Sequence, residues 1–274
     1  MYVTDGKVTG IMRVMTNTYK TFTLITGASG GFGAEFARLC AAEGRNLILV
    51  ARSSGKLERL ARELSGDVAI HTITQDLSEP GAAQKVYQQI RRQRLIVDQL
   101  INNAGSGDFA PLSRANPVRQ ERMIELNVTS LTLLTTLLLP GMVQRRQGRI
   151  MNVGSTASFI PIPNMSVYAA SKAFVLSFSE TLTTELRGSG VTVTCLCPGP
   201  AKTGFSRNAR LVTTHPISRS NVSAISVARF GYRAMLDGVP LAIPGFRNQL
   251  LIGFTKLLPR ALVRRMMLAY GSRA

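Results

Sequence analysis

The chain has 274 residues, with 33 Lys and Arg against 15 Asp and Glu, so its formal net charge is +18. At 45% hydrophobic and 18% charged residues it can bury a full core, which excludes disordered and fibrous proteins. Three cysteines cannot form a disulfide framework, two histidines are too few for a His-based metal site, and no segment resembles a secretory leader. We therefore expect a cytoplasmic protein without a metal.

The basic residues are concentrated toward the C-terminus. Residues 201–274 hold 12 basic side chains and one acidic side chain, Asp237. The arginines are scattered and Trp is absent, which argues against a nucleic-acid partner. An anionic small molecule or an acidic membrane surface suits this distribution better.

Residues 1–20 show no regular pattern and are expected to form an N-terminal arm. After them, apolar β-branched segments alternate with helical ones. The expected strands lie at about 22–26, 47–51, 68–73, 97–101, 149–153 and 191–196, and the expected helices at 32–43, 54–65, 79–93, 117–139 and 166–187. This alternation predicts an α/β fold of βαβ units, in which helices cover both faces of one parallel sheet. A single domain over 21–245 would then be followed by a C-terminal tail, 246–274.

The stretch 126–143 carries no charge over 18 residues and could suggest a membrane span. It is rich in Thr, and we expect Pro140-Gly141 to break it before a span is complete. A buried or dimer-forming helix is therefore the preferred interpretation.

The first expected strand runs directly into a glycine-rich turn, Thr26-Gly27-Ala28-Ser29-Gly30-Gly31-Phe32-Gly33, and a helix follows. Such a turn brings backbone N–H groups and the positive end of the helix dipole to a phosphate, and a Cβ would block the close approach. The spacing is T-G-x-x-x-G-x-G, although Gly27, Gly30 and Gly33 also satisfy T-G-x-x-G-x-x-G.

Further turns follow other expected strands. Asp76-Leu77 follows the third strand, Asn102-Asn103-Ala104-Gly105 the fourth, and Pro198-Gly199-Pro200 the sixth, with Thr203 close behind. Ligands of an open α/β sheet bind at the carboxyl ends of its strands, so these turns predict one dinucleotide site.

A candidate proton-transfer group opens the last long helix. Tyr168 and Lys172 are four residues apart and share one helix face. The Lys172 ammonium is expected to lower the pKa of the phenol and make it a competent acid for a carbonyl oxygen. Ser155 ends the fifth strand, where its hydroxyl could hold a substrate oxygen, and Asn127 lies in the preceding helix.

Together these motifs resemble the classical short-chain dehydrogenase/reductase family over residues 21–240. The resemblance rests on the glycine motif, the N-N-A-G at 102–105, the tetrad Asn127, Ser155, Tyr168 and Lys172, and Pro198-Gly199. It implies a seven-stranded, Rossmann-type doubly wound sheet, a nicotinamide cofactor, and a homodimer or homotetramer built through the two long helices. One departure is Gly154, where many members carry a serine.

The resemblance also implies roles for individual residues. Tyr168 would be the acid/base, Lys172 would bind the nicotinamide ribose, and Ser155 would polarise the substrate carbonyl. Asn127 would support a proton-relay water on the Lys172 side. Asp76 would meet the adenine, Asn103 and Ala104 the adenosine ribose region, and Thr203 the carboxamide.

The cofactor is expected to be NADP(H). The second strand ends in Ala51, where an NAD enzyme of this architecture carries a carboxylate for the ribose, and no acid follows until Glu58. Arg52 and Ser53 offer donors for a 2′-phosphate instead. The expected cofactor-binding residues are Gly27, Ser29, Gly31, Phe32, Gly33, Arg52, Ser53, Asp76, Leu77, Asn103, Ala104, Gly105, Tyr168, Lys172, Pro198, Gly199 and Thr203.

Apolar residues on loops beside the tetrad are expected to form a substrate wall, and they suggest an aliphatic or lipid-like carbonyl. They are Phe109, Ile160, Ile162, Met165 and Phe205. The loop at 200–223 and the tail are expected to set specificity. Cys195 and Cys197 are expected to be small core residues rather than a metal or redox pair.

The tail is expected to be a basic amphipathic segment. Apolar residues alternate with basic ones from 247 to 270, and Pro259 should divide the run into two short helices. A dimer contact or a lid with solvated arginines is the favoured interpretation, and peripheral contact with a membrane is the alternative.

The predicted function is an NADP-dependent carbonyl reductase or alcohol dehydrogenase with Tyr168 as its acid/base. Two alternatives remain open at this point. One is a catalytically silent protein that senses a dinucleotide. The other is a sugar-nucleotide epimerase or dehydratase, which would need a larger substrate domain than the residues after 200 supply.

Overall fold

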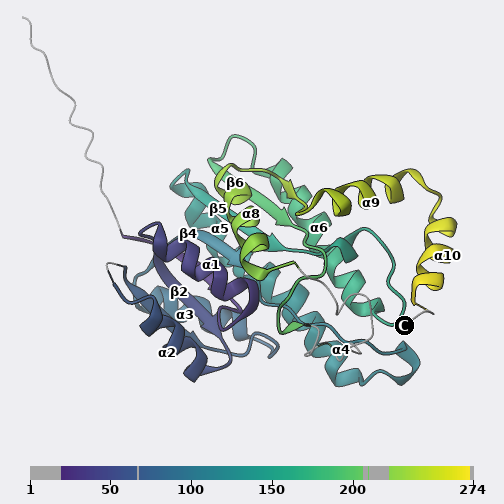
Figure 1. The fold of residues 1–274 in the computed structure, drawn as a ribbon. Coiled ribbons are helices and arrows are strands. Elements are labelled where there is room, and N and C mark those ends of the chain that lie inside the picture. Colours follow the sequence, from purple (N-terminus) through teal and green to yellow (C-terminus); the bar gives the residue numbers. More distant parts are fainter. Residues whose placement is uncertain (1–19, 67, 206–208, 210–221, 272–274) are drawn as a thin grey trace, which may run out of the picture.

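The computed structural model describes residues 20–66, 68–205, 209 and 222–271. The expected N-terminal arm and most of the loop at 200–223 lie outside these residues. Within them, seven parallel strands form one sheet in the order β3-β2-β1-β4-β5-β6-β7 (Figure 1). The order reverses between β1 and β4, which makes the sheet doubly wound, and the predicted fold class is confirmed.

Each predicted strand is present, with ends shifted by at most two residues. The strands are β1 (Thr21–Thr26), β2 (Asn46–Ala51), β3 (Ile70–Thr74), β4 (Ile96–Asn102), β5 (Gly148–Val153), β6 (Val191–Leu196) and β7 (Leu241–Ala242). The last strand has only two residues, which is too short to give an apolar pattern of its own.

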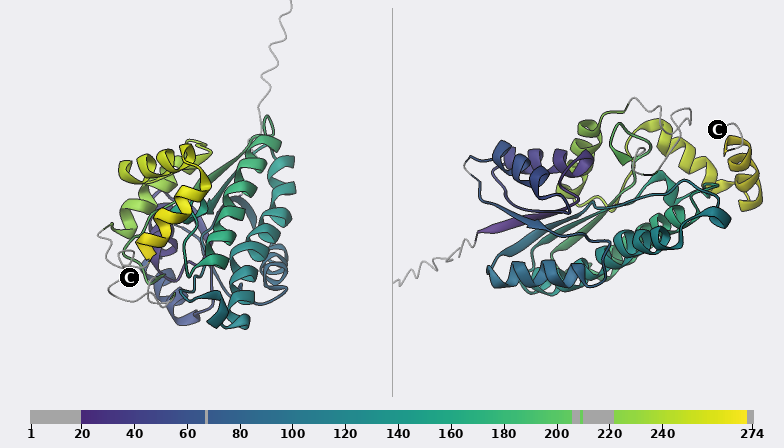
Figure 2. Two further views of the ribbon diagram at one scale, coloured as in Figure 1. Left: turned by 90° about the vertical axis from the view of Figure 1, so that its right-hand side faces the viewer. Right: turned by 90° about the horizontal axis from the view of Figure 1, so that it is seen from below.

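Helices cover both faces of the sheet (Figure 2). The longer ones are α1 (Gly31–Ala42), α2 (Ser54–Glu63), α3 (Ala82–Arg92), α4 (Pro117–Ile124), α5 (Ser130–Gln144), α6 (Ser166–Glu185), α8 (Ala224–Leu236), α9 (Phe246–Leu257) and α10 (Arg260–Gly271). As expected, Pro259 separates α9 from α10.

Two hydrophobic cores form because side chains of a strand alternate between the faces of the sheet. In β2, Leu47 and Leu49 pack with α1, α2 and α8, whereas Ile48 and Val50 pack with α3, α5 and α6. All four side chains are fully buried. This explains why the sequence of β2 is a continuous apolar run, as is typical of strands in a parallel sheet.

The uncharged stretch lies in a continuous helical segment, Pro117–Gln144, which is long and apolar enough by length and composition to cross a membrane. Leu134, Leu138 and Met142 of this segment belong to the core beneath the sheet. The expected break at Pro140 is wrong, because α5 continues to Gln144. Pro140 and Thr136, whose carbonyl loses its intrahelical donor, both lie on the exposed side, where water can replace that bond.

The turn between α6 and β6 packs against the connection between α5 and β5, and two glycines of this turn allow a matched test of that contact. Gly188 and Gly190 both have positive φ, +75° and +81°. A Cβ at Gly188 would meet open space, whereas a Cβ at Gly190 would overlap the backbone carbonyl of Arg146. Gly188→Ala should therefore cost about 1–2 kcal/mol through the left-handed backbone alone. Gly190→Ala should cost a further 1–3 kcal/mol or so, because the backbone between α5 and β5 must shift.

The measurement is the urea midpoint of each variant at constant m-value. Equal midpoints for the two alanine variants would contradict this account of the turn.

Candidate active site

A cavity of about 850 Å³ opens at the carboxyl edge of the sheet. The glycine turn, the ends of β2, β3, β4 and β5, the start of α6 and the loop after β6 all line it. Of the expected site residues, the lining includes Gly27, Ser29, Gly31, Phe32, Arg52, Ser53, Asp76, Leu77, Asn103, Ala104, Gly105, Ser155, Tyr168, Lys172, Pro198, Gly199 and Thr203. Gly33 and Asn127 lie behind this surface.

The glycine turn is shaped by close backbone contacts. Gly27 and Gly31 have φ of +65° and +56°, in the region that favours glycine. A Cβ at Gly27 would lie 2.9 Å from Ala104 Cα, and one at Gly33 would overlap the Gly27 carbonyl. Because α1 begins at Gly31, its free N–H groups lie beside the cavity. The turn therefore fits a pyrophosphate.

The Thr26 side chain joins this turn to the end of β4. Its Oγ1 accepts hydrogen bonds from the N–H groups of Asn103 and Ala104, each at 3.0 Å. In return, the Asn103 amide donates to the Thr26 carbonyl at 2.8 Å. The Asn103 side chain is thus used to hold the glycine turn, and its backbone and that of Ala104 remain as part of the cavity wall.

The end of the cavity beside β2 is cationic. Ala51 ends the strand, and Arg52, Ser53 and Lys56 line the cavity, the two cations with exposed side chains. Lys56 was not among the expected site residues. It lies in the first turn of α2, and because Arg52 precedes this helix, no helical spacing in the sequence relates the two cations. Opposite, Asp76 Oδ1 accepts from the N–H and hydroxyl of Ser78 at 3.0 and 2.7 Å.

Tyr168, Ser155 and Lys172 converge at the other end. Lys172 is 5% exposed, and its Nζ donates to the Val153 carbonyl at 2.7 Å. The same Nζ lies 5.9 Å from the centre of the Tyr168 ring. Ser155 follows β5, and its Oγ accepts from the Ala157 N–H at 3.1 Å. The i, i+4 spacing on α6 therefore places the phenol and the ammonium together at the end of β5.

The expected lowering of the Tyr168 pKa by Lys172 is wrong. Burial raises the pKa of Tyr168 to about 12, and hydrogen bonding with Ser155 opposes that rise only in part. Burial also lowers the pKa of Lys172 to about 8, and its ammonium points to the Val153 carbonyl. At neutral pH the phenol is consequently a protonated donor, which is the form needed to give a proton to a carbonyl oxygen.

Asn127 supports the site from a π-helical turn, Glu125–Thr129. Its Oδ1 accepts from the Ser106 N–H at 2.9 Å, and its Nδ2 donates to the Ser106 carbonyl and to Ser171 Oγ at 2.9 and 3.0 Å. Ser171 is the residue before Lys172. Asn127 therefore positions the loop after β4 against α6, and such π-turns are frequent at functional sites.

The departure at Gly154 has a packing reason. A Cβ there would lie 2.9 Å from Cys197 Sγ and 3.2 Å from Cys195 Sγ. Both cysteines are fully buried with their Sγ atoms 3.6 Å apart. They fill the space beneath the residue before Ser155, as small core residues do.

An apolar cluster forms the wall beside Tyr168. The cluster contains Met123, Ala157, Met165, Tyr168 and Ala209, with Phe109, Ile162, Val167 and Phe205 packed against it. The Tyr168 and Phe205 rings lie 5.3 Å apart. Ile162, Met165 and Phe205 line the cavity as expected, together with Met123 and Leu126, whereas the described lining does not include Phe109 or Ile160.

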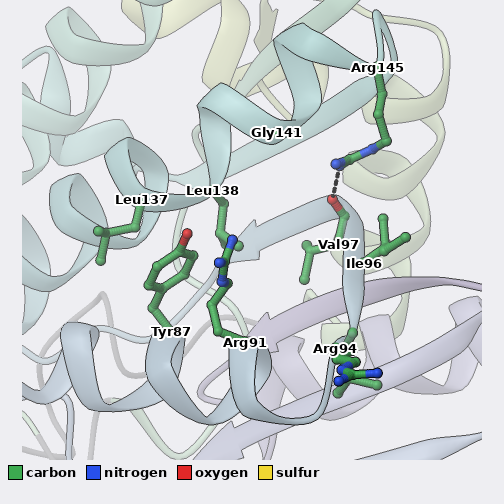
Figure 3. Close-up of a pocket in the computed structure, with 10 residues that line it drawn as sticks. Tyr87, Arg91, Arg94, Ile96, Val97, Leu137, Leu138, Gly141 and Arg145 are labelled. Atoms are coloured by element: carbon green, nitrogen blue, oxygen red, sulfur yellow. Dashed lines mark hydrogen bonds between the residues drawn. The ribbon is translucent and has the colours of Figure 1, made fainter.

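A second cavity, about 440 Å³, lies between α3 and α5 at the opposite edge of the sheet (Figure 3). There the Arg145 guanidinium donates to the Val97 carbonyl at 2.9 Å. This bond ties the end of α5 to the start of β4, far from the carboxyl edge where the site residues gather.

Comparison with known proteins agrees with this geometry. A family model described as short chain dehydrogenase matches residues 21–212. The sulfoacetaldehyde reductase of Chromohalobacter salexigens is 41% identical over 185 residues, which is 66% of this chain and 73% of that protein. A very-long-chain 3-oxoacyl-CoA reductase of Phaeosphaeria nodorum is 38% identical over 182 residues, 64% of this chain but 53% of that protein.

Among solved structures, a short-chain dehydrogenase from Sphingobium yanoikuyae in complex with NADPH superposes with a TM-score of 0.75 at 30% identity. The match covers 88% of this chain and 97% of that one. The similarity thus extends beyond the sheet to most of the described chain.

Proposed function

This chain belongs to the short-chain dehydrogenase family and is a hydride-transferring oxidoreductase, and from that premise we propose that it reduces an apolar carbonyl with NADPH through Tyr168. The observation that carries the proposal is the group formed by buried Tyr168 and Lys172 and half-buried Ser155, which opens into the same cavity as the glycine turn. Neither alternative, a silent sensor or a sugar-nucleotide epimerase, gains support from the relatives, whose names are those of reductases and dehydrogenases.

The chain's own residues would divide the reaction as follows. NADPH, when bound, supplies the hydride. The Ser155 hydroxyl would donate a hydrogen bond to the substrate oxygen, and Tyr168 would give it a proton from its neutral phenol. Lys172, held by the Val153 carbonyl, would keep positive charge beside the phenol as that proton leaves.

The cofactor would extend along the cavity from the β2 end to Tyr168. Arg52, Ser53 and Lys56 would hold the 2′-phosphate, the glycine turn the pyrophosphate, and Asp76 the adenine. Lys172 would bind the nicotinamide ribose and Thr203 the carboxamide. The remaining lining residues would provide backbone contacts.

The substrate would occupy the apolar wall formed by Met123, Ile162, Met165 and Phe205. This wall favours an aliphatic or lipid-like carbonyl, and the resemblance to a very-long-chain 3-oxoacyl-CoA reductase supports it. Residues 21–245 would form the catalytic domain.

We also propose a cytoplasmic homodimer or homotetramer built through α5 and α6. Their outward faces carry apolar side chains such as Val143 and Phe174, 37% and 39% exposed. The helical segment Pro117–Gln144 is only partly covered by the rest of this chain. Association of two such faces would bury its remaining apolar surface.

Tyr168→Phe tests the proton donor. The variant keeps the ring and its contact with Phe205 but removes the hydroxyl, so turnover should fall at least ~100-fold while NADPH binding, measured by fluorescence, stays the same. Tyr232→Phe is the matched control, because Tyr232 is a core residue outside the cavity lining, and its hydroxyl donates to the exposed Glu43 at 3.0 Å. It should lose stability but keep kcat per folded molecule. Near-normal turnover of Tyr168→Phe would refute the assignment.

Arg52→Ala tests the phosphate contact. Loss of one hydrogen bond to a charged group should cost about 1.5–3 kcal/mol in kcat/KM with NADPH and leave the value with NADH nearly unchanged. Lys56→Ala should act in the same direction. Arg59→Ala, an exposed arginine of α2 that does not line the cavity, is the control. A preference for NADH in the unaltered enzyme would overturn the NADP(H) assignment.

A substrate series tests the apolar wall. The value of kcat/KM for straight-chain ketones should rise about three- to fourfold for each added methylene, because burying one contributes about 0.8 kcal/mol, until the wall is covered. Ile162→Ser should flatten this dependence. A flat series in the unaltered enzyme, or a preference for sulfoacetaldehyde over every longer carbonyl, would contradict the apolar substrate.

A further inference from the structure

We propose that α9 and α10 form a membrane-binding surface through which the enzyme docks on an anionic lipid bilayer. Among the described residues, eight of the sixteen exposed large hydrophobic side chains lie between 246 and 268. Scattered single apolar side chains are normal on a protein surface, but a concentration of this kind marks an interaction site.

On α9 these side chains form one outward stripe. Phe246, Leu250, Phe254 and Leu257 follow one another at helical spacing and are 75%, 63%, 53% and 85% exposed. The opposite face of the helix is already buried, since Ile252 is only 2% exposed. The stripe is therefore a second apolar face, which the fold of this chain leaves uncovered.

On α10 exposed basic and apolar side chains are adjacent. Leu268, 60% exposed, lies one turn after Arg264, which itself lies one turn after Arg260. Leu262, 44% exposed, lies one turn before Arg265. Val263 anchors the helix to the protein at 6% exposure. Exposed apolar side chains with arginines beside them are the combination by which a helix lies in a membrane interface.

The positive charge of the tail indicates what kind of partner the surface binds. Residues 238–274 contain six basic residues and no acidic one. A symmetric contact with a second copy would bring together two patches of the same positive net charge. A lid is also disfavoured, because the stripe is exposed rather than packed over the cavity. An anionic bilayer satisfies both the apolar stripe and the positive charge.

The surface lies beside the active site. A Cβ at Gly199, which lines the cavity, would lie 2.8 Å from Asn248 Nδ2 on the inner face of α9. Figure 2 shows α9 and α10, in yellow, at the end of the molecule away from the start of β1. Docking would therefore bring the bilayer close to the cavity. Delivery of a lipid-like carbonyl by this route rests on the proposed function, whereas docking itself does not.

Co-sedimentation of the full chain with NADPH and lipid vesicles tests the proposal. The protein should pellet with vesicles containing phosphatidylglycerol, less with pure phosphatidylcholine, and less again as salt screens the charge. Leu250→Ser/Phe254→Ser should lower the vesicle–water partition coefficient at least ~10-fold, because the apolar surface that these two side chains bury in the bilayer would be lost. Phe230→Ser/Val239→Ser removes two side chains of 42% and 40% exposure near α8 and should change nothing.

Arg260→Gln/Arg264→Gln should abolish the preference for anionic lipid. No binding to anionic vesicles, or equal binding by the tail and control variants, would overturn the proposal. A tail variant that changes the oligomeric mass without any vesicle binding by the parent would overturn it too, and would assign the surface to a second copy. Since no readout depends on turnover, failure here is distinct from failure of the proposed reaction.

Discussion

The buried ammonium of Lys172 is the constraint around which the active site is arranged. A charge with 5% exposure needs a partner, and the Val153 carbonyl provides it at 2.7 Å. That bond fixes α6 to the end of β5, so the residue one turn earlier, Tyr168, must lie beside Ser155. Asn127 adds a second tie through Ser171, the neighbour of Lys172. The position of the Tyr168 phenol thus follows from where the Lys172 ammonium can be buried.

The side chains around Lys172 are closely packed, and this explains why glycines and small residues lie at this edge of the sheet. A Cβ at Gly105 would come within 3.4 Å of both Lys172 Nζ and Asn127 Oδ1. At Gly154 it would press on the two buried thiols. A serine at 154 therefore needs a smaller residue at 195 or 197, and the cysteines and the glycine are best understood as one packing solution rather than as separate departures from the family pattern.

Most of the fold could be predicted from the sequence because each strand of a doubly wound sheet is a local apolar run, and the glycine turn and Tyr168–Lys172 spacing are local as well. What could not be predicted depends on three-dimensional packing. Lys56 reaches the cavity only because α2 starts beside the end of β2. The π-turn at Asn127 and the continuation of α5 through Pro140 follow from how that segment packs on the sheet. The direction of the Tyr168 pKa shift depends on burial, which no spacing reveals.

The cavity has two chemically different ends, and this division bears on how the molecule works. Arg52 and Lys56 lie at one end, where a phosphate can remain partly solvated, and both are exposed. Tyr168, the buried Met123 and Met165 and the partly buried Phe205 lie at the other end, which is therefore apolar. Burial raises the pKa of the Tyr168 phenol to about 12, so the phenol is protonated at neutral pH. The burial that holds Tyr168 in place therefore also keeps its hydroxyl in the form that can donate a proton.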